Sequence, residues 1–458
     1  MSIARKLTTA LLSVALIAAQ GAVLVEAKDK VRRGPNLIRD AEIEGLLRLY
    51  SKPIFKAAGL NPSAIKVYVI ADPSINAFVA GGQRVFIHTG LITRADSPNQ
   101  VIGVLAHETG HIAGGHLARM NSELASANVQ SIVGMLVGAA AIVGGVMSGN
   151  SEAAQAGQGV ILGSQSLSQR NFLQYQRGME STADQSALKY LATTGQSAKG
   201  MLTLFNVLAN ESLASTSRAD PYVFSHPMPF DRIRSLEAAA KSSPYFDKPD
   251  DPGFLLRFQL AKAKLSGFLD SPQSVFQRYP SADKSLPARY ARAIAMFRRG
   301  DIKNAVPVID SLTAELPQDP YFWELKAQAY LENGNPVAGL PAIKKARSLL
   351  PDNGLLQMLH AQILVSTDNP KNADEALSIL NKAKRTEIDV PDIYKYMARA
   401  YALKNDIPRA ELATAEFAWL TGDKTMAVTK ATSAQNFFKK GSVEWLRASD
   451  LLNFAKKK

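Results

Sequence analysis

The first clear pattern along the chain is a helical one, from residue 38 to about residue 60. Its apolar side chains recur every three or four residues, which places them on one face of a helix. These side chains are Ile43, Leu46, Leu47, Tyr50 and Ile54. Gly59 and Pro62 then supply stop signals. The segment therefore predicts one amphipathic helix.

A small sheet is predicted next, because the following apolar runs are short and rich in β-branched residues. Lys66–Ile70 and Arg84–His88 have the composition of strands. Ile75–Val79 lies between them, and Gly81 and Gly82 supply the turn.

A longer helix is predicted from Pro98 to about Met120. Ser97 can cap its first turn, and Pro98 fits the first helical position. Gln100 can complete a capping box with Ser97. This helix carries the candidate chemistry described below.

Residues 129–149 form an uncharged stretch, long enough by count to cross a bilayer. The stretch contains five glycines, which weakens a membrane-spanning interpretation. We favour a buried or interfacial helical hairpin beside the candidate site, and a membrane span remains the alternative.

Residues 1–27 have the pattern of a secretory signal peptide. Two basic residues precede an uncharged stretch over residues 7–25, and Ala27 supplies a small residue at the expected cleavage position. An uncleaved N-terminal anchor is the alternative. We expect the mature protein in the periplasm, either soluble or peripherally attached to a membrane.

The C-terminal half repeats at a fixed interval after a segment rich in Pro and Asp at 241–253, which we interpret as a linker. Pairs and triplets of residues recur 34 positions apart. They are Ala293, Ala327 and Ala361, then Gly300 and Gly334, then Pro317 and Pro351. This period is typical of tetratricopeptide repeats, which stack antiparallel helix pairs. We predict such a domain over 254–458, with a plain helical bundle as the alternative.

Composition limits the chemistry that the chain can perform. Its 458 residues include six His and no Cys, so a metal site must use His and carboxylate ligands. The formal net charge of +13 arises from Lys and Arg scattered along the chain. Because no basic run stands out, we expect no nucleic-acid partner. A solvated basic surface is the simplest interpretation, and contact with an anionic membrane or an acidic partner is the alternative.

His107 and His111 stand four residues apart on the predicted helix. At 3.6 residues per turn their side chains lie within about 40° of one another, so both imidazoles can reach one metal ion. Glu108 is rotated by about 100° from His107, which places its carboxylate beside the ion as a general base. A core-facing His pair on an amphipathic helix is the alternative interpretation.

Glu180 and Asp184 repeat the same spacing on a second predicted helix, which begins near residue 170 and extends past residue 190. Glu180 can supply a carboxylate ligand, and Asp184 can hydrogen-bond the outer nitrogen of a ligating His. An exposed acidic helix is the alternative, although the surrounding segment has few acidic residues.

Together these motifs resemble the zinc peptidases that include the HtpX-type proteases and the CaaX-prenyl endopeptidases. The matching motifs are His107-Glu-x-x-His111, Glu180-x-x-Ala-Asp184, Asn76-Ala-Phe-x-x-Gly-Gly82 and Ser225-His226-Pro227 with Arg232-Ile233. The resemblance implies a mainly α chain: an α+β gluzincin-type zinc peptidase domain with a small sheet over 28–240, then an α-solenoid of repeats. The chain lacks the several spanning helices of the integral-membrane members, which argues against a prenylated substrate.

The resemblance also implies roles for individual residues. One zinc ion per chain would bind His107, His111 and Glu180, and Glu108 would act as the general base. His226 would approach the zinc, either blocking its open position or stabilising the oxyanion. A packing His in a turn is the alternative for His226.

Our leading hypothesis is a periplasmic zinc endopeptidase in envelope and outer-membrane protein quality control, which cleaves misfolded or stalled envelope proteins. A client segment would pair with an exposed strand edge, formed by Arg84, Val85, Phe86, Ile87 and His88. The repeats would hold the client or dock on the outer-membrane β-barrel assembly machinery. Two alternatives stay open: a chaperone or scaffold for outer-membrane protein assembly with gated, rarely used protease activity, and a membrane-anchored protease.

Overall fold

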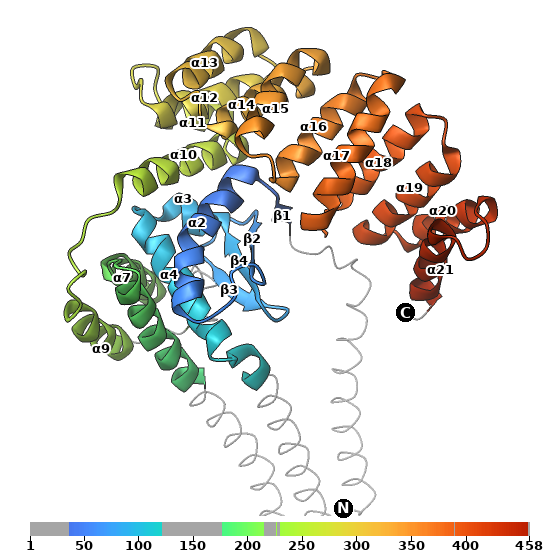
Figure 1. Ribbon diagram of the computed structural model, residues 1–458. Coiled ribbons are helices and arrows are strands. Elements are labelled where there is room, and N and C mark those ends of the chain that lie inside the picture. Colours follow the sequence, from blue (N-terminus) through green and yellow to red (C-terminus); the bar gives the residue numbers. More distant parts are fainter. Residues whose placement is uncertain (1–35, 121–175, 215–225, 227–229, 389, 457–458) are drawn as a thin grey trace, which may run out of the picture.

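The computed structural model shows a mainly helical chain with one small sheet, as predicted (Figure 1). It describes residues 36–120, 176–214, 226, 230–388 and 390–456. The predicted signal peptide and the uncharged stretch at 129–149 therefore lie outside the described residues. No helix among those that are described combines the length and apolar character needed to cross a bilayer.

The predicted first helix is confirmed as α2 (Ala41–Ala57), and its apolar face is buried. Asp40 starts it, because the Asp40 carboxylate accepts hydrogen bonds from the backbone N–H groups of Glu42 and Ile43. The helix packs across the small sheet and against α4 (Pro98–Ala113), the helix that carries His107 and His111.

The two main strands form where the sequence predicts them, as β2 (Lys66–Ile70) and β4 (Arg84–His88). The strand between them is β3 (Ala77–Ala80), and the short β1 (Leu37–Ile38) lies at the other side. The sheet order is β1-β2-β4-β3, with β2 and β4 parallel and the other pairs antiparallel.

The prediction that Arg84–His88 forms an exposed edge is wrong. β4 lies inside the sheet, since β2 pairs with one side of it and β3 with the other. The reason is the turn at Gly81 and Gly82, whose φ angles of 57° and 91° fold β3 directly back onto β4. The edge strands of the described sheet are β3 and β1.

The helix that begins at Pro98 ends at Ala113, seven residues earlier than the expected Met120. Gly115 has a φ of 63°, a left-handed conformation that ends the helix, and residues 116–120 form a separate helical turn. The predicted capping box also differs. Ser97 makes no capping bond, and the Gln100 side chain accepts a hydrogen bond from the backbone N–H of Asp96 at 2.8 Å.

Four more helical segments belong to the described residues of the N-terminal part. They are α3 (Thr89–Arg94), a helix over residues 176–193, α7 (Lys199–Ala214) and α9 (Phe230–Lys241). α7 packs on α4, and α2 covers another side of it, so α4 runs through the main hydrophobic core.

The C-terminal part is a succession of helices, each packed on the next, that curves around the N-terminal part (Figure 1). The helices are α10 (Pro252–Leu269), α11 (Pro272–Arg278), α12 (Leu286–Arg298), α13 (Ile302–Glu315), α14 (Pro320–Glu332), α15 (Pro336–Leu349), α16 (Gly354–Ser366), α17 (Ala373–Thr386), α18 (Pro391–Leu403), α19 (Ile407–Thr421), α20 (Lys424–Phe437) and α21 (Val443–Lys456). A single 3-10 turn, η2 (Pro370–Asn372), precedes α17.

Residues that recur at the 34-residue interval occupy equivalent positions in these helices. Ala293, Ala327 and Ala361 are all fully buried, where a larger side chain would push neighbouring helices apart. Gly300 and Gly334 adopt φ angles of 76° and 77° just after α12 and α14, the left-handed conformation that ends a helix.

α10 joins the two parts rather than belonging to one. Phe258 and Leu265 lie in the same core cluster as the residues of α2 and α4. The Tyr50 hydroxyl of α2 also donates a hydrogen bond to the Phe254 carbonyl at 3.0 Å. A truncation in the predicted linker would therefore remove part of the N-terminal core.

Candidate metal centre

The site begins on α4, where the four-residue spacing brings two imidazoles together as expected. The Nε2 atoms of His107 and His111 lie 3.0 Å apart. His107 is fully buried, and its ring packs edge-on against Phe205 of α7. Packing against α7 therefore holds the first His ring in place.

The helix at 176–193 brings the carboxylate that the sequence predicts as a ligand. It crosses α4 so closely that a Cβ on Gly110 would lie 2.8 Å from the Ala183 carbonyl oxygen. Glu180, one turn before Ala183, places its two oxygens 3.3 Å from His107 Nε2 and 3.4 Å from His111 Nε2. Glycine at 110 is thus what allows the two motifs to meet.

His226 adds a fourth donor from a distant part of the chain. Its Nδ1 lies 3.3 Å from His107 Nε2 and 3.1 Å from a Glu180 oxygen. One donor atom from each of His107, His111, Glu180 and His226 falls within 4.8 Å of all the others. We call these four residues the zinc cluster.

The geometry of the zinc cluster fits a tetrahedral metal ion. At zinc bond lengths of 2.0–2.2 Å, neighbouring donor atoms of a tetrahedron lie about 3.3 Å apart, close to the separations found here. Three imidazoles and one carboxylate are donor types that zinc accepts. Nitrogen lone pairs that converge this closely in a buried place require a cation or a proton between them.

Two further residues support the zinc cluster from outside. Asp184 Oδ1 lies 2.9 Å from His107 Nδ1, where it can hold the His107 ring in one tautomer. Arg232 of α9 donates to both Asp184 oxygens, at 2.5 and 2.8 Å, and its Nη2 lies 3.0 Å from Glu180. Burial opposes the charged form of Asp184, yet the hydrogen bonds from Arg232 and His107 hold the pKa of Asp184 below its ordinary value.

Arg232-Ile233 is among the motifs that carry the family resemblance, but no role is predicted for Arg232 itself. Its position in α9 comes near the zinc cluster only after folding.

Glu108 lies beside the zinc cluster rather than within it, as the 100° rotation predicts. The carboxylate is buried, and within the described part of the chain neither of its oxygens has a hydrogen-bond partner. Glu108 Oε1 lies 3.4 Å from His226 Nε2. Burial raises the pKa of Glu108, which favours proton uptake by a general base.

The remaining histidines have other neighbours. The turn at Gly115 brings His116 back towards α4, so that His116 Nδ1 lies 3.0 Å from the outer nitrogen, Nδ1, of His111. His88 Nδ1 lies 3.0 Å from the Ser74 hydroxyl, and His360 contacts Arg347 in the C-terminal part. Neither His88 nor His360 belongs to the zinc cluster.

Comparison with known proteins connects this geometry to a family. Residues 43–240 match the model of peptidase family M48, and this range contains the whole zinc cluster together with Glu108. The chain carries an M48 peptidase domain. It is a metalloendopeptidase, and its metal is zinc.

Relatives match this chain over most of its length or over part of it. The β-barrel assembly-enhancing protease of Escherichia coli K12 is 23% identical over 425 residues, covering 91% of this chain and 84% of the relative. The protein of that name in Yersinia pestis is 23% identical over 387 residues, covering 83% and 76%. The metalloprotease YcaL of E. coli is 28% identical over 188 residues, covering 40% of this chain and 66% of YcaL.

Proposed function

We propose that this metalloendopeptidase acts in the periplasm on misfolded or stalled outer-membrane proteins. One observation carries the proposal: a buried set of converging metal ligands with a buried, hydrogen-bond-deficient Glu108 directly beside it. The names of the full-length relatives support the choice of outer-membrane β-barrel proteins as clients.

In this proposal each residue of the site has its own role. His107, His111 and Glu180 hold the metal, and Asp184 and Arg232 keep those ligands oriented. Zinc, when bound, supplies a Lewis acid that polarises the scissile carbonyl and activates water. Glu108 takes the proton from the attacking water and passes it to the leaving amine.

His226 restrains this activity in our proposal. It brings a fourth donor into the cluster and lies between the ligands and Glu108, at 3.1 Å from Glu180 and 3.4 Å from Glu108. A substrate carbonyl or an attacking water needs the same position. His226 must therefore move before peptide cleavage, so the protease is gated.

The client backbone would pair with β3 rather than with β4, because β3 is the edge strand on the side of the sheet that contacts α4. Backbone pairing recognises an extended chain with little regard to sequence, which suits a protease for unfolded clients.

We propose in addition that residues 254–458 are tetratricopeptide-like repeats that hold the client or dock on the β-barrel assembly machinery. Supporting this, consecutive helices pack against one another, and the alanines and glycines of the 34-residue period occupy equivalent positions. The net charge of +13 fits peripheral contact with an anionic membrane surface.

The test uses the full chain, purified with zinc, and an outer-membrane β-barrel protein held unfolded. We expect cleavage of the unfolded client, no cleavage of the folded barrel, and loss of cleavage on chelation that zinc restores. The variant Glu108→Gln provides the matched inactive control. A protein that cleaves a short peptide but never an unfolded barrel would refute the client assignment while leaving the peptidase intact.

The competing function is a chaperone or scaffold whose protease activity is rarely used. The position of His226 as a fourth metal ligand favours this function, because a metal without an open position cannot cleave a peptide. Comparing Glu108→Gln with the unmodified protein in a barrel-folding assay separates the two: a chaperone keeps its effect on barrel folding without Glu108, and a protease loses it.

A further inference from the structure

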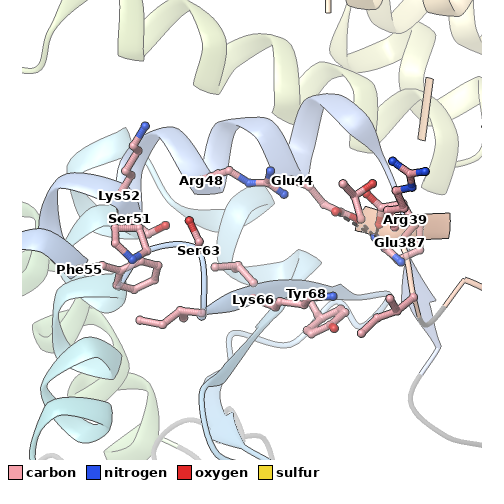
Figure 2. A pocket seen from close by; sticks show the side chains of 16 residues that line it. Arg39, Glu44, Arg48, Ser51, Lys52, Phe55, Ser63, Lys66, Tyr68 and Glu387 are labelled. Carbon is pink, nitrogen blue, oxygen red and sulfur yellow. Dashed lines mark hydrogen bonds and ion pairs between the residues drawn. The ribbon is translucent and has the colours of Figure 1, made fainter. Parts of the chain in front are cut away.

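A cleft of 510 Å³ lies between α2 and β2, at the junction of the two parts of the chain (Figure 2). α2 forms one wall, β2 forms the floor, and residues 385–388 at the end of α17 close it. Figure 2 shows Arg39 and Glu387 meeting at one end of the cleft and Lys52 and Phe55 at the other. The cleft shares no residue with the zinc cluster.

The charges that line the cleft are mostly positive. Five cationic side chains (Arg39, Arg48, Lys52, Lys66, Arg385) face two carboxylates (Glu44, Glu387), a difference of +3. Arg39 already satisfies both carboxylates, at 2.7 Å to Glu44 and 2.5 Å to Glu387. The structure gives the other four cations no ion-pair partner among the described residues, so their charge is available to a ligand.

The floor of the cleft offers an open strand edge. In the described part of the chain β1 pairs with Val69 and Ile70, so no described strand lies beside Lys66 and Val67 on that side. The backbone N–H of Ala71 points to the β1 side, where it donates to Asn36 at 2.8 Å. Because backbone direction alternates along a strand, the N–H and C=O of Val67 point the same way, into the cleft.

The same space contains apolar surface and an unsatisfied hydroxyl. Phe55, Ile65 and Val67 line it, so a ligand with apolar side chains can bury them there. Ser51 is fully buried, lines the cleft and has no hydrogen-bond partner for its hydroxyl in the described part of the chain. A free inorganic anion would use the cations and leave both the edge and the apolar surface unused.

We propose that this cleft is a second binding site, which takes an extended acidic segment of a protein client as an added strand on β2. The proposal rests on the proposed function, because it gives the protease a place to hold a client away from the zinc cluster. The chain's own residues 28–35 do not suit the cleft, since they carry four basic residues and one acidic residue.

The experiment measures fluorescence anisotropy of a labelled 12-residue peptide that alternates Glu with Val or Thr. The full chain is used with zinc and with Glu108→Gln, so that the peptide stays intact. Arg48→Glu combined with Lys52→Glu reverses the charge of the cleft wall. Lys439→Glu combined with Lys440→Glu reverses two equally exposed charges between α20 and α21 and is the matched control.

We expect the cleft variant to bind the acidic peptide at least about 10-fold more weakly and the control to change by less than about twofold, both differences shrinking at high salt. A Gln-for-Glu peptide should bind weakly to every variant. N-methylation of alternate peptide amides should also weaken binding, because it removes backbone pairing without altering charge.

Three outcomes would overturn the proposal. The cleft variant could bind the acidic peptide as well as the control does, or the N-methylated peptide could bind unchanged. Alternatively, the cleft variant could lose binding to vesicles of phosphatidylglycerol and phosphatidylcholine while keeping the peptide, which would assign the cleft to a membrane. Cleavage of an unfolded barrel is measured separately, so peptide binding without cleavage would count against the proposed function alone.

Discussion

Two buried clusters of ionisable side chains in the described part of the chain differ in how their donor atoms are paired. In the first, the four residues of the zinc cluster point their donor atoms at one another. In the second, the buried Lys264 of α10 places its ammonium 2.8 Å from Asp40, 3.4 Å from Glu42 and 3.3 Å from Glu324.

The difference shows how a functional cluster can be told from a structural one. In the second cluster, which we call the Lys264 cluster, Lys264 supplies the cation for Asp40, Glu42 and Glu324. These ion pairs lie within the chain and connect α2, α10 and α14. Arg232 contacts the carboxylates of Glu180 and Asp184, whereas the donor nitrogens of the zinc cluster converge on one another. Burial of charge is common to both clusters, and the converging nitrogen donors are what point to a metal in the first.

The largest effect should follow from Glu108→Gln, which removes the proton acceptor without removing a ligand. We expect peptide cleavage to fall by about 10³-fold or more while zinc content stays near one per chain. His107→Ala should lose both cleavage and zinc. Zinc content by mass spectrometry, measured alongside cleavage rates, checks that Glu108 is the base and His107 a ligand. Equal zinc loss from both variants would contradict these roles.

Lys264→Met should produce the next largest effect, because it leaves the buried Glu42 and Glu324 and the half-buried Asp40 without their cation. We expect the free energy of unfolding to drop by about 3–5 kcal/mol in urea titrations. Lys303→Met, at an exposed lysine of α13, is the control and should change stability little. A loss below about 1 kcal/mol would mean that the Lys264 cluster does not hold the two parts together.

His226→Ala tests whether the fourth donor restrains the protease. If His226 blocks the site, cleavage of an unfolded substrate should rise about 10-fold, since the block is worth roughly one hydrogen-bonded contact to a charged group. If His226 instead stabilises the oxyanion, cleavage should fall by about 10²-fold or more. Steady-state rates with saturating zinc distinguish the two, and an unchanged rate would leave His226 with a packing role only.

The smallest effect concerns pH and the Lys264 cluster. Burial raises the pKa of Glu42 from 4.5 to about 7, although Lys264 opposes the shift. Between pH 4.5 and about 7, folded Glu42 keeps a proton that unfolded Glu42 has lost. Protonation of Glu42 therefore contributes its full stabilisation of the fold below pH 4.5, and this contribution disappears as the pH rises through 7.

Thermal unfolding between pH 5 and pH 8 measures this dependence. We expect the midpoint temperature to fall less steeply with pH for Glu42→Gln than for the unmodified protein. Glu332→Gln, at an exposed position of α14, should leave the slope unchanged. Parallel slopes for all three proteins would show that Glu42 does not titrate in this range.

Local patterns in the sequence were enough for most of the N-terminal elements. The apolar spacing in α2 and the β-branched runs of β2 and β4 each depend on neighbours within one turn or one strand, and these elements form at the expected residues. The end of α4 and the interior place of β4 were predicted wrongly. In both places a glycine with positive φ changes the direction of the chain. The spacing of apolar residues carries no information about such a turn.

What the sequence determined by itself is the chemistry that a single helix can present. His107 and His111 share a face because of helical geometry alone, and the carboxylate pair at 180 and 184 follows the same rule. How these helices meet depends on folding, through the close approach at Gly110, and so do the side chains that join them from further along the chain. Arg232 and Lys264 find their carboxylate partners across 48 to 224 positions of sequence, because burial makes an unpaired charge too costly and only the folded chain can bring its partner near.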